Sequence, residues 1–433
     1  MTWRSIFGAA LLVTTPTLVA CSESNPSTPD AAVAFDGELP LGEVTYHGDV
    51  RPILAEHCVG CHVEGGIGPF PLDTYETTAP IATRIAQVTR DRIMPPYLAD
   101  ASGDCQSFDD PQWLTDRELD TLAAWDEQGE PLGDPATPAP VAPTLPTLDG
   151  ELTTIDIGID YAADTTGPDD YRCFMVEAPF ADEYFLTGHE VHPGNRATVH
   201  HVIVFSPFDD EATTQAREYD AADPEPGYTC FGAPGVDAFP VVLWAPGAGA
   251  TNYPAGTGIR MAGGAPLIVQ VHYNTLAGNG TDRTSVDLET ATSVPRAARI
   301  IPVADFDLAL APRMSSVETT DTWDLSLFTR GAALPLTIYG TFPHMHTLGR
   351  TLRVEHIRES DSAEQCLVDV PRWDFNWQLA YFYERPLTIS TLDSIRITCG
   401  YDTSSRSDMV TWGEGTQDEM CLNFFYVVIA GGL

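Results

Sequence analysis

Closely spaced histidines and one methionine are the residues of this sequence best suited to bind a metal ion. His344 and His346 are one residue apart in an apolar, β-prone run, so in an extended strand their side chains point to the same face. Two imidazoles and a thioether such as that of Met420 form a soft ligand set that favours copper. A second set would consist of three imidazoles, those of His200, His201 and His272. A His-x-His pair can also be two half-exposed surface residues, but the six donors together predict two metal sites.

Two adjacent histidines can bind one metal ion only if the strand that contains them is irregular. His200 and His201 are neighbours, and neighbouring residues of a regular strand face opposite sides of the sheet. A β-bulge or a strand end at this point would direct both rings to one ion. Gln270 lies on the same strand face as His272, so its amide is a candidate to hydrogen-bond and orient that ring. Taken alone, His272 is equally compatible with a half-buried histidine that binds no metal.

A different chemistry is indicated nearer the N-terminus. Cys58, Cys61 and His62 form a Cys-x-x-Cys-His motif, in which both thiols bond to the vinyl groups of haem c and the histidine ligates the iron. A zinc site would need a second cysteine pair, and a redox dithiol would not need His62. Met94, 32 residues later and followed by two prolines, resembles the sixth-ligand loop of small c-type cytochromes. We therefore expect residues 44–133 to form a small all-α, mono-haem cytochrome c domain.

Two helices are expected in this domain. The first spans residues 77–93, with Ile81, Ile85 and Val88 on one side. The second begins after Thr115, which with Glu118 forms a capping box. A proline-rich linker, residues 134–149, follows the domain and is expected to be semi-rigid and extended.

From residue 150 the pattern changes to short apolar runs separated by Gly, Pro, Asn and Asp. Such runs predict strands at 198–205, 267–273, 334–339, 395–399 and 422–428. This part of the chain is therefore expected to be an all-β unit of antiparallel sandwich or jelly-roll class. The whole protein would be multidomain, which agrees with its length of 433 residues.

The charge of the chain excludes some partners. The formal net charge is −40, from 62 acidic and 22 basic residues, and none of the basic residues is lysine. Such a surface repels phosphates and anionic headgroups, so nucleic acid is not an expected partner.

The first residues resemble an export signal. Residues 1–20 contain Arg4 and the apolar run 6–13, which is too short to span a bilayer and fits a signal peptide. Leu18 to Cys21 looks like a bacterial lipobox, and residues 21–43 would then be a flexible tether, although Cys21 could also follow an ordinary cleavage site. We expect an exported lipoprotein, anchored by lipid at the periplasmic face of a membrane or at the cell surface.

Four motifs in chain order carry a family resemblance over residues 151–433. They are His-His, Gln-Val-His-Tyr, His-x-His and Glu-Met-Cys, and the set resembles the copper type II ascorbate-dependent monooxygenases of the peptidylglycine α-hydroxylating and dopamine β-monooxygenase type. The resemblance implies two tandem jelly-roll-like β-sandwiches, residues 150–290 and 291–433, with one copper ion each. It implies that His200, His201 and His272 hold an electron-transfer copper. His344, His346 and Met420 would hold the catalytic copper that activates dioxygen.

Nine cysteines agree with export and with this resemblance. Three are assigned to lipid and haem, which leaves six thiols and fifteen possible pairings. The resemblance implies the bridges Cys399–Cys421, beside the methionine ligand, and Cys173–Cys230. Elimination leaves Cys105 with Cys366, which would tether the cytochrome domain to the second sandwich.

The expected activity is hydroxylation of an activated C–H bond of a small organic substrate with dioxygen. The fused haem would relay electrons to the copper ions, starting from ascorbate, another reductant, or a periplasmic or surface electron donor. Where peptide-amidating relatives bind a substrate carboxylate, this chain has Phe342, Leu422 and Phe424, so a neutral or aromatic substrate is expected. The alternative is a copper and haem electron-transfer or copper-binding lipoprotein without oxygenase activity. An oxidase that makes peroxide is a further alternative.

Overall fold

The computed structural model describes residues 42–431, apart from 65–67, 110, 141–145, 231, 247, 276–277 and 414. The signal peptide, the lipobox and nearly all of the tether expected for residues 1–43 lie outside the described residues. None of the helices in the described residues combines the length and the apolar composition needed to cross a lipid bilayer.

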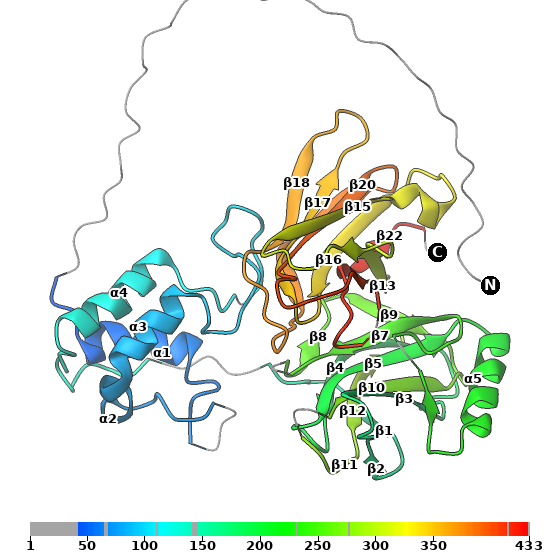
Figure 1. The fold of residues 1–433 in the computed structure, drawn as a ribbon, viewed down its shortest axis with the longest axis horizontal. Coiled ribbons are helices and arrows are strands. Elements are labelled where there is room, and N and C mark those ends of the chain that lie inside the picture. The colour runs from blue at the N-terminus through cyan, green and yellow to red at the C-terminus, as the bar shows by residue number, and fades with distance from the viewer. Residues whose placement is uncertain are drawn as a thin grey trace, which may run out of the picture. The chain divides into compact units, whose positions relative to one another are not determined.

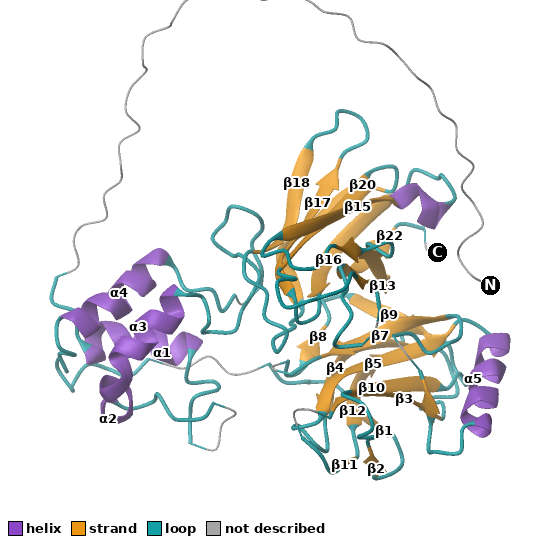
Figure 2. Cartoon of the chain, viewed as in Figure 1, coloured by secondary structure: helices purple, strands orange, loops and turns teal. Residues whose placement is uncertain are grey.

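Residues 44–133 contain helices joined by long loops (Figures 1 and 2). The helices are η1 (Tyr46–Val50), α1 (Arg51–His57), α2 (Tyr75–Thr78), η2 (Ala79–Ile81), α3 (Ala82–Arg90) and α4 (Asp116–Glu127). The capping box of α4 is present: the Thr115 side chain accepts from the Glu118 N–H, and the Glu118 side chain accepts from the Thr115 N–H. The single helix predicted over residues 77–93 is wrong in its bounds, because the segment is divided by η2, which contains Pro80. Proline lacks the N–H that a continuous helix needs.

The rest of the described chain contains twenty-two strands, which make three large sheets and two small ones. A five-stranded sheet has the order β6 (Tyr228–Thr229), β3 (Asp169–Val176), β10 (Leu267–Asn274), β5 (Val199–Pro207), β7 (Ala238–Trp244). A four-stranded sheet has the order β15 (Val317–Asp324), β20 (Ser394–Tyr401), β17 (Gly349–Ile357), β18 (Glu364–Val370). The small sheets pair β11 (Thr281–Asp282) with β2 (Tyr161–Ala162), and β14 (Ala309–Leu310) with β21 (Val410–Thr411).

A nine-stranded sheet runs through both halves of the β region. Its order is β1 (Leu152–Asp156), β12 (Ser285–Ala291), β4 (Tyr184–His192), β9 (Thr257–Met261), β13 (Arg296–Ala304), β22 (Leu422–Ile429), β16 (Pro335–His344), β19 (Tyr381–Ser390), with β8 (Thr251–Asn252) paired to β4. β9 and β13 pair in parallel over three residues, and β13 then pairs antiparallel with β22. One backbone ladder therefore joins the two halves.

Two apolar cores divide this β region into two sandwiches. In the first sandwich, β5 and β10 pack on β4, β9 and β12 through residues such as Val202, Val271 and Leu186. In the second, β17 and β20 pack on β16 and β22 through residues such as Val354, Ile338 and Phe425. Sandwich-type sheets thus confirm the all-β prediction. The helix α5 (Asp210–Ala222), beginning after the N-cap Asp209, and the short helix η3 (Leu325–Thr329) were not predicted.

The three expected disulfides are present: Cys105–Cys366, Cys173–Cys230 and Cys399–Cys421. The first joins the segment 97–109, which follows α3, to β18 of the second sandwich. Phe108 forms a backbone bridge with Tyr383, and the Asp100 N–H donates to the Asp369 carbonyl oxygen. Leu98 and Phe108 belong to the core of the second sandwich. The helical region is therefore attached to the second sandwich, although the first sandwich follows it in sequence.

Candidate metal centre

Three histidines meet on two neighbouring strands of the first sandwich. In the antiparallel pair of β5 and β10, His272 lies opposite His201. The next residue of β10, Tyr273, lies opposite Val199, so His200 is the extra residue of a β-bulge. One ring nitrogen from each histidine lies within 4.8 Å of the other two. Of the two alternatives that the sequence left open, a bulge or a strand end, the structure contains the bulge, and the three imidazoles converge.

The hydrogen bonds of these rings leave nitrogen lone pairs for a metal ion. Nε2 of His272 is 2.9 Å from Oδ1 of Asp169, so Nε2–H donates to the carboxylate and Nδ1 keeps its lone pair. That Nδ1 is 3.2 Å from Nδ1 of His201. Both ring nitrogens of His200 are buried and have no hydrogen-bond partner within the described chain. Unpaired buried nitrogens are costly, so this donor set fits a bound metal ion.

Burial keeps these imidazoles neutral at pH 7. It lowers the pKa of His200 to about 4, with a smaller contribution from the neighbouring His344. Burial and the nearby imidazoles lower the pKa of His201 and of His272 well below the usual histidine value. Neutral imidazole is the form that binds a metal ion, so the rings need not lose a proton first.

Hydrogen bonds also orient the rings of His344 and His346. Nδ1 of His344, at the end of β16, is 2.5 Å from Oε1 of Gln378, and Nδ1 of His346 is 3.1 Å from the backbone oxygen of Asp418. Both Nδ1 atoms therefore carry the proton, and both Nε2 atoms keep a lone pair. Burial lowers the pKa of His344 to about 4 and that of His346 to about 3. The ring centroids lie 5.3 Å apart.

Strand register brings Met420 to this pair. β16 and β22 are antiparallel, with His344 opposite Leu422. Continuing that register by two residues places His346 opposite Met420, which is 5% exposed. All three side chains line the same cavity. The structure therefore places Met420 on the wall of the cavity that His344 and His346 also line, and a shared metal site at these residues stays a prediction.

The Glu419 carboxylate fixes the two ends of these strands to each other. It accepts hydrogen bonds from the backbone N–H groups of His346, Leu348 and Met420. Burial raises the pKa of Glu419 to about 7, and these three N–H groups oppose the shift. On the other side of Met420, the Cys399–Cys421 disulfide ties the strand to β20. The backbone around the thioether is thus held from two directions.

The two histidine sets adjoin. The rings of His201 and His344 are perpendicular, with centroids 6.2 Å apart. Phe375 of the second sandwich stacks on His200 with a centroid distance of 4.2 Å and lies 6.1 Å from His346. An aromatic ring from one sandwich therefore covers a candidate ligand of the other.

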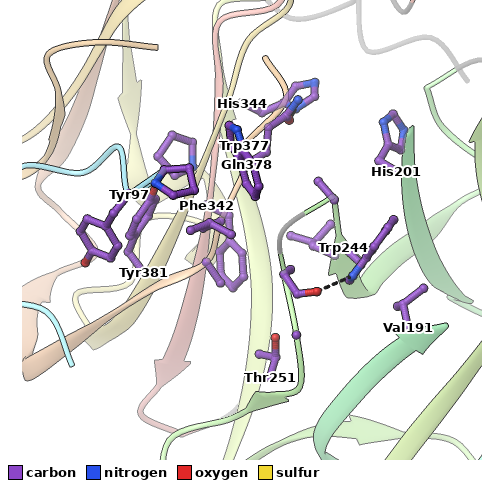
Figure 3. Close-up of a pocket in the computed structure, with 18 of the residues that line it drawn as sticks. Tyr97, Val191, His201, Trp244, Thr251, Phe342, His344, Trp377, Gln378 and Tyr381 are labelled. Carbon is purple, nitrogen blue, oxygen red and sulfur yellow. Dashed lines mark hydrogen bonds between the residues drawn. The ribbon is translucent and has the colours of Figure 1, made fainter. Parts of the chain in front are cut away.

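A cavity of about 960 Å³ opens beside both sets. Figure 3 shows Phe342, Trp377 and Tyr381 grouped on one side of this pocket, with Trp244 and His201 on the other. Tyr97, Pro95 and Cys61 of the helical region also line it. The cavity is thus bordered by both sandwiches and by the helical region.

Gln270 does not orient His272 as predicted. Its side chain is fully buried, and its amide donates to the backbone oxygen of Cys230, with the disulfide sulfur 3.6 Å away. Asp169 makes the contact with His272 instead. Sharing a strand face with His272 was not enough, because the long Gln270 side chain reaches the Cys173–Cys230 bridge.

Four residues around the centre were missed from the sequence: Asp169, Phe375, Gln378 and Thr416. They lie at a strand start or in loops, with no short spacing to any histidine. Only Glu419 could have been suspected, because it stands directly before Met420.

The candidate haem residues cluster in part. Cys58, Cys61 and His62 occupy the turns after α1, and the two cysteines are free thiols. Burial raises the pKa of the Cys58 thiol to about 12. Nδ1 of His62 is 2.9 Å from the backbone oxygen of Phe70, so Nδ1–H donates and Nε2 keeps its lone pair. Met94 lies in the loop after α3, before a cis bond to Pro95.

The arrangement combines two candidate donor sets with a cavity whose wall is mostly apolar. A set of two imidazoles and a thioether favours copper, and a three-imidazole set also accepts it. Sites with few protein ligands leave positions open for a small molecule. The geometry is thus suited to redox chemistry on a molecule held in the cavity.

Two family models match the β region. Residues 157–279 match the N-terminal domain of copper type II ascorbate-dependent monooxygenase, and residues 310–428 match its C-terminal domain. Each match contains one of the two candidate copper sites.

Curated proteins give the same indication at low identity. Tyramine beta-hydroxylase of Caenorhabditis briggsae is 27% identical over 278 residues, which is 59% of this chain and 45% of that protein. DBH-like monooxygenase protein 1 of Mus musculus is 24% identical and covers 59% of this chain and 43% of its own length. Dopamine beta-hydroxylase of Rattus norvegicus is 24% identical, with 65% and 47% covered. The chain spans about half the length of these relatives.

Proposed function

Residues 157–279 and 310–428 belong to the copper type II ascorbate-dependent monooxygenase family, and from this we propose that the chain hydroxylates an activated C–H bond of a small organic substrate. One oxygen atom of dioxygen enters the product and the other leaves as water. Each turnover therefore takes up two electrons and two protons. Ascorbate or another reductant supplies the electrons.

The observation that carries this proposal is that His344, His346 and Met420 line one cavity. Both histidines keep an Nε2 lone pair because their Nδ1 atoms are already hydrogen-bonded. Copper bound there would supply one-electron redox chemistry and an open position for dioxygen. His200, His201 and His272 would hold the second copper, which stores one electron.

The cavity wall supports a neutral or aromatic substrate. Phe342, Leu422 and Phe424 line the cavity, and Phe342 lies opposite Phe424 in the pairing of β16 with β22. These are the positions at which peptide-amidating relatives would bind a carboxylate. The apolar wall that these three residues form excludes water and contains no cation to pair with an acid, whereas Arg196 lines another part of the cavity.

A covalently bound haem c would deliver electrons one at a time. Cys58 and Cys61 would hold it through thioether bonds, and His62 and Met94 would bind the iron. The free lone pair on Nε2 of His62 and the two unpaired thiols support this assignment. Cys61 lines the same cavity as His201, which supports electron delivery to the three-histidine site.

Export as a lipoprotein completes the proposal. Three disulfides in one chain are typical of oxidising compartments, which agrees with a protein on the periplasmic face of a membrane or on the cell surface. The lipid would be attached at Cys21.

Metal content together with oxygen uptake tests the proposal. We expect two copper ions and one haem per full chain, and oxygen consumption that depends on a neutral aromatic compound with a benzylic C–H bond. Met420→Ala should remove the copper–sulfur signal from X-ray absorption and abolish substrate-dependent oxygen uptake. Met409→Ala is the matched control, because Met409 is 62% exposed.

Other results favour the alternatives. Two bound copper ions without substrate-dependent oxygen uptake would indicate a copper-binding or electron-transfer protein. A peroxide yield equal to the oxygen consumed would indicate an oxidase.

A further inference from the structure

Asp169 joins a candidate ligand of the first site to the loop that leads to the second. The Asp169 side chain, at the start of β3, is 7% exposed. Its Oδ1 accepts from Nε2–H of His272 at 2.9 Å and from the hydroxyl of Thr416 at 2.5 Å. Its Oδ2 accepts from the backbone N–H of Thr416 at 3.1 Å. One buried carboxylate is therefore shared between the two sandwiches.

The loop that contains Thr416 is compact and reaches the other histidine set. The Asp418 N–H donates to the Gly415 carbonyl oxygen, and the Asp418 side chain accepts from the Gly415 N–H. The Asp418 backbone oxygen then accepts from Nδ1–H of His346. Only one residue separates Thr416 from Asp418. His272 and His346 are thus linked through Asp169 and a three-residue stretch of backbone.

We propose that this Asp169–Thr416 link couples the two copper sites, so that copper(I) at one site raises the affinity of the other. A cation on His272 strengthens the hydrogen bond from its ring to Asp169, since charge-assisted bonds are stronger. A fixed Asp169 holds Thr416 and therefore the loop that ends at Met420. The second copper then meets ligands that are already ordered, and it binds more tightly. The inference rests on the proposed function, because it needs copper at both histidine sets.

The coupling must act in both directions. If filling the first site raises the affinity of the second by some factor, filling the second raises that of the first by the same factor. A factor of about 5 to 150 is typical of coupled binding sites.

Copper(I) titration against a competing chelator measures this factor. The copper–sulfur signal of Met420 in X-ray absorption identifies the second site. In the unaltered full chain, we expect that site to bind at least 5-fold more tightly than in His201→Ala, where the first site is lost. Thr416→Val keeps the backbone N–H but loses the hydroxyl. With this substitution present, adding His201→Ala should change the affinity of the second site by a factor near 1.

A second hydroxyl between the sandwiches provides the control. The Thr257 hydroxyl, on β9, lies 3.0 Å from the Tyr426 hydroxyl, on β22, and neither touches a candidate ligand. Thr257→Val should keep the coupling, and Thr416→Ser should restore it. If Thr257→Val abolishes the coupling as fully as Thr416→Val, the coupling depends on the general packing of the two sandwiches and not on the Asp169–Thr416 link.

The outcomes also separate this inference from the proposed function. Two copper ions that bind independently in the unaltered chain would overturn the coupling alone. A chain that binds no copper at either histidine set would overturn both.

Discussion

The imidazole rings of His201 and His344 stand perpendicular to each other with centroids 6.2 Å apart, although they belong to different sandwiches. Burial is the largest cause of the lowered pKa values of both rings. An electron held at the three-histidine set would thus have a short distance to cover to the second set. No movement of the sandwiches is required to bring the two sets together.

The hydrogen bond from His344 to Gln378 is expected to tune copper binding. Gln378→Ala removes the acceptor that fixes the proton on Nδ1, so the ring can turn or change tautomer. We expect copper(I) affinity at the second site to fall by about 10- to 100-fold in chelator competition. Gln365→Ala, an exposed glutamine on β18, should leave it unchanged. Equal affinities in both variants would mean that Gln378 has no orienting role.

Acid should weaken the helical region through Glu118. A hydrogen bond from His57, together with bonds from Thr115, lowers the Glu118 pKa to about 2 against the effect of burial. Because the folded-state pKa is depressed, the stabilisation is present above the ordinary value near 4.5 and is lost as the pH falls toward 2. Glu118→Gln keeps the capping geometry but removes the carboxylate. The acid-dependent change in the free energy of unfolding should therefore be smaller in this variant by about 1 kcal/mol, a low value because Glu118 is partly solvated. Helical circular dichroism against pH and urea measures it.

The matched control for that experiment lies on the same helix. Glu127 is exposed near the end of α4, so Glu127→Gln should leave the acid-dependent loss of stability unchanged. The same loss in the unaltered chain and in Glu118→Gln would contradict the prediction.

Phe342 is expected to contribute to substrate affinity. Phe342→Ala removes an aromatic wall of the cavity, and the lost apolar contact should weaken binding of a neutral aromatic compound by about 10-fold. Quenching of tryptophan fluorescence reports binding, because Trp377 lines the same cavity. Phe208→Ala is the control, since that ring is 58% exposed. Tighter binding of an N-acylglycine than of the neutral compound would count against the apolar assignment.

The Cys105–Cys366 disulfide is expected to stabilise the attachment of the helical region. It closes a loop with a sequence separation of 261, so replacing both cysteines by serine frees a long segment of the unfolded chain. We expect a loss of roughly 2 to 5 kcal/mol in the free energy of unfolding, measured with urea. Copper content should not change, because neither cysteine touches a candidate ligand. An unchanged urea midpoint would show that the core contacts of Leu98 and Phe108 hold the segment without the bridge.

Features that depend on residues close together in the sequence were predicted well. The strands at residues 198–205 and 267–273 are found as β5 and β10 within two residues at each end, because short apolar runs bounded by turn residues indicate buried strands. The conflict between adjacent histidines and strand geometry predicted a bulge or a strand end at this point, and the structure has a bulge at His200. The capping box of α4 was also readable, because it depends on residues only three positions apart.

Contacts made by tertiary packing could not be predicted in this way. Asp169 stands next to Asp170 before a strand and reads as a turn residue, but it reaches both His272 and Thr416. The ring of Phe375 lies on His200 across the boundary between sandwiches. Gln270 was misassigned because strand alternation gives the face of a side chain but not its partner.

The parallel pairing of β9 with β13 limits how the chain can be divided. Arg296, Ala297 and Ala298 pair with Thr257, Gly258 and Ile259, so the sandwiches share backbone hydrogen bonds. A fragment that begins at residue 291 would leave the N-terminal end of β13 as a bare edge, and the complementary fragment would bare β9. Exposed edges recruit strands from other molecules. Either half produced alone is therefore expected to self-associate, whereas both halves expressed together should recombine across this edge.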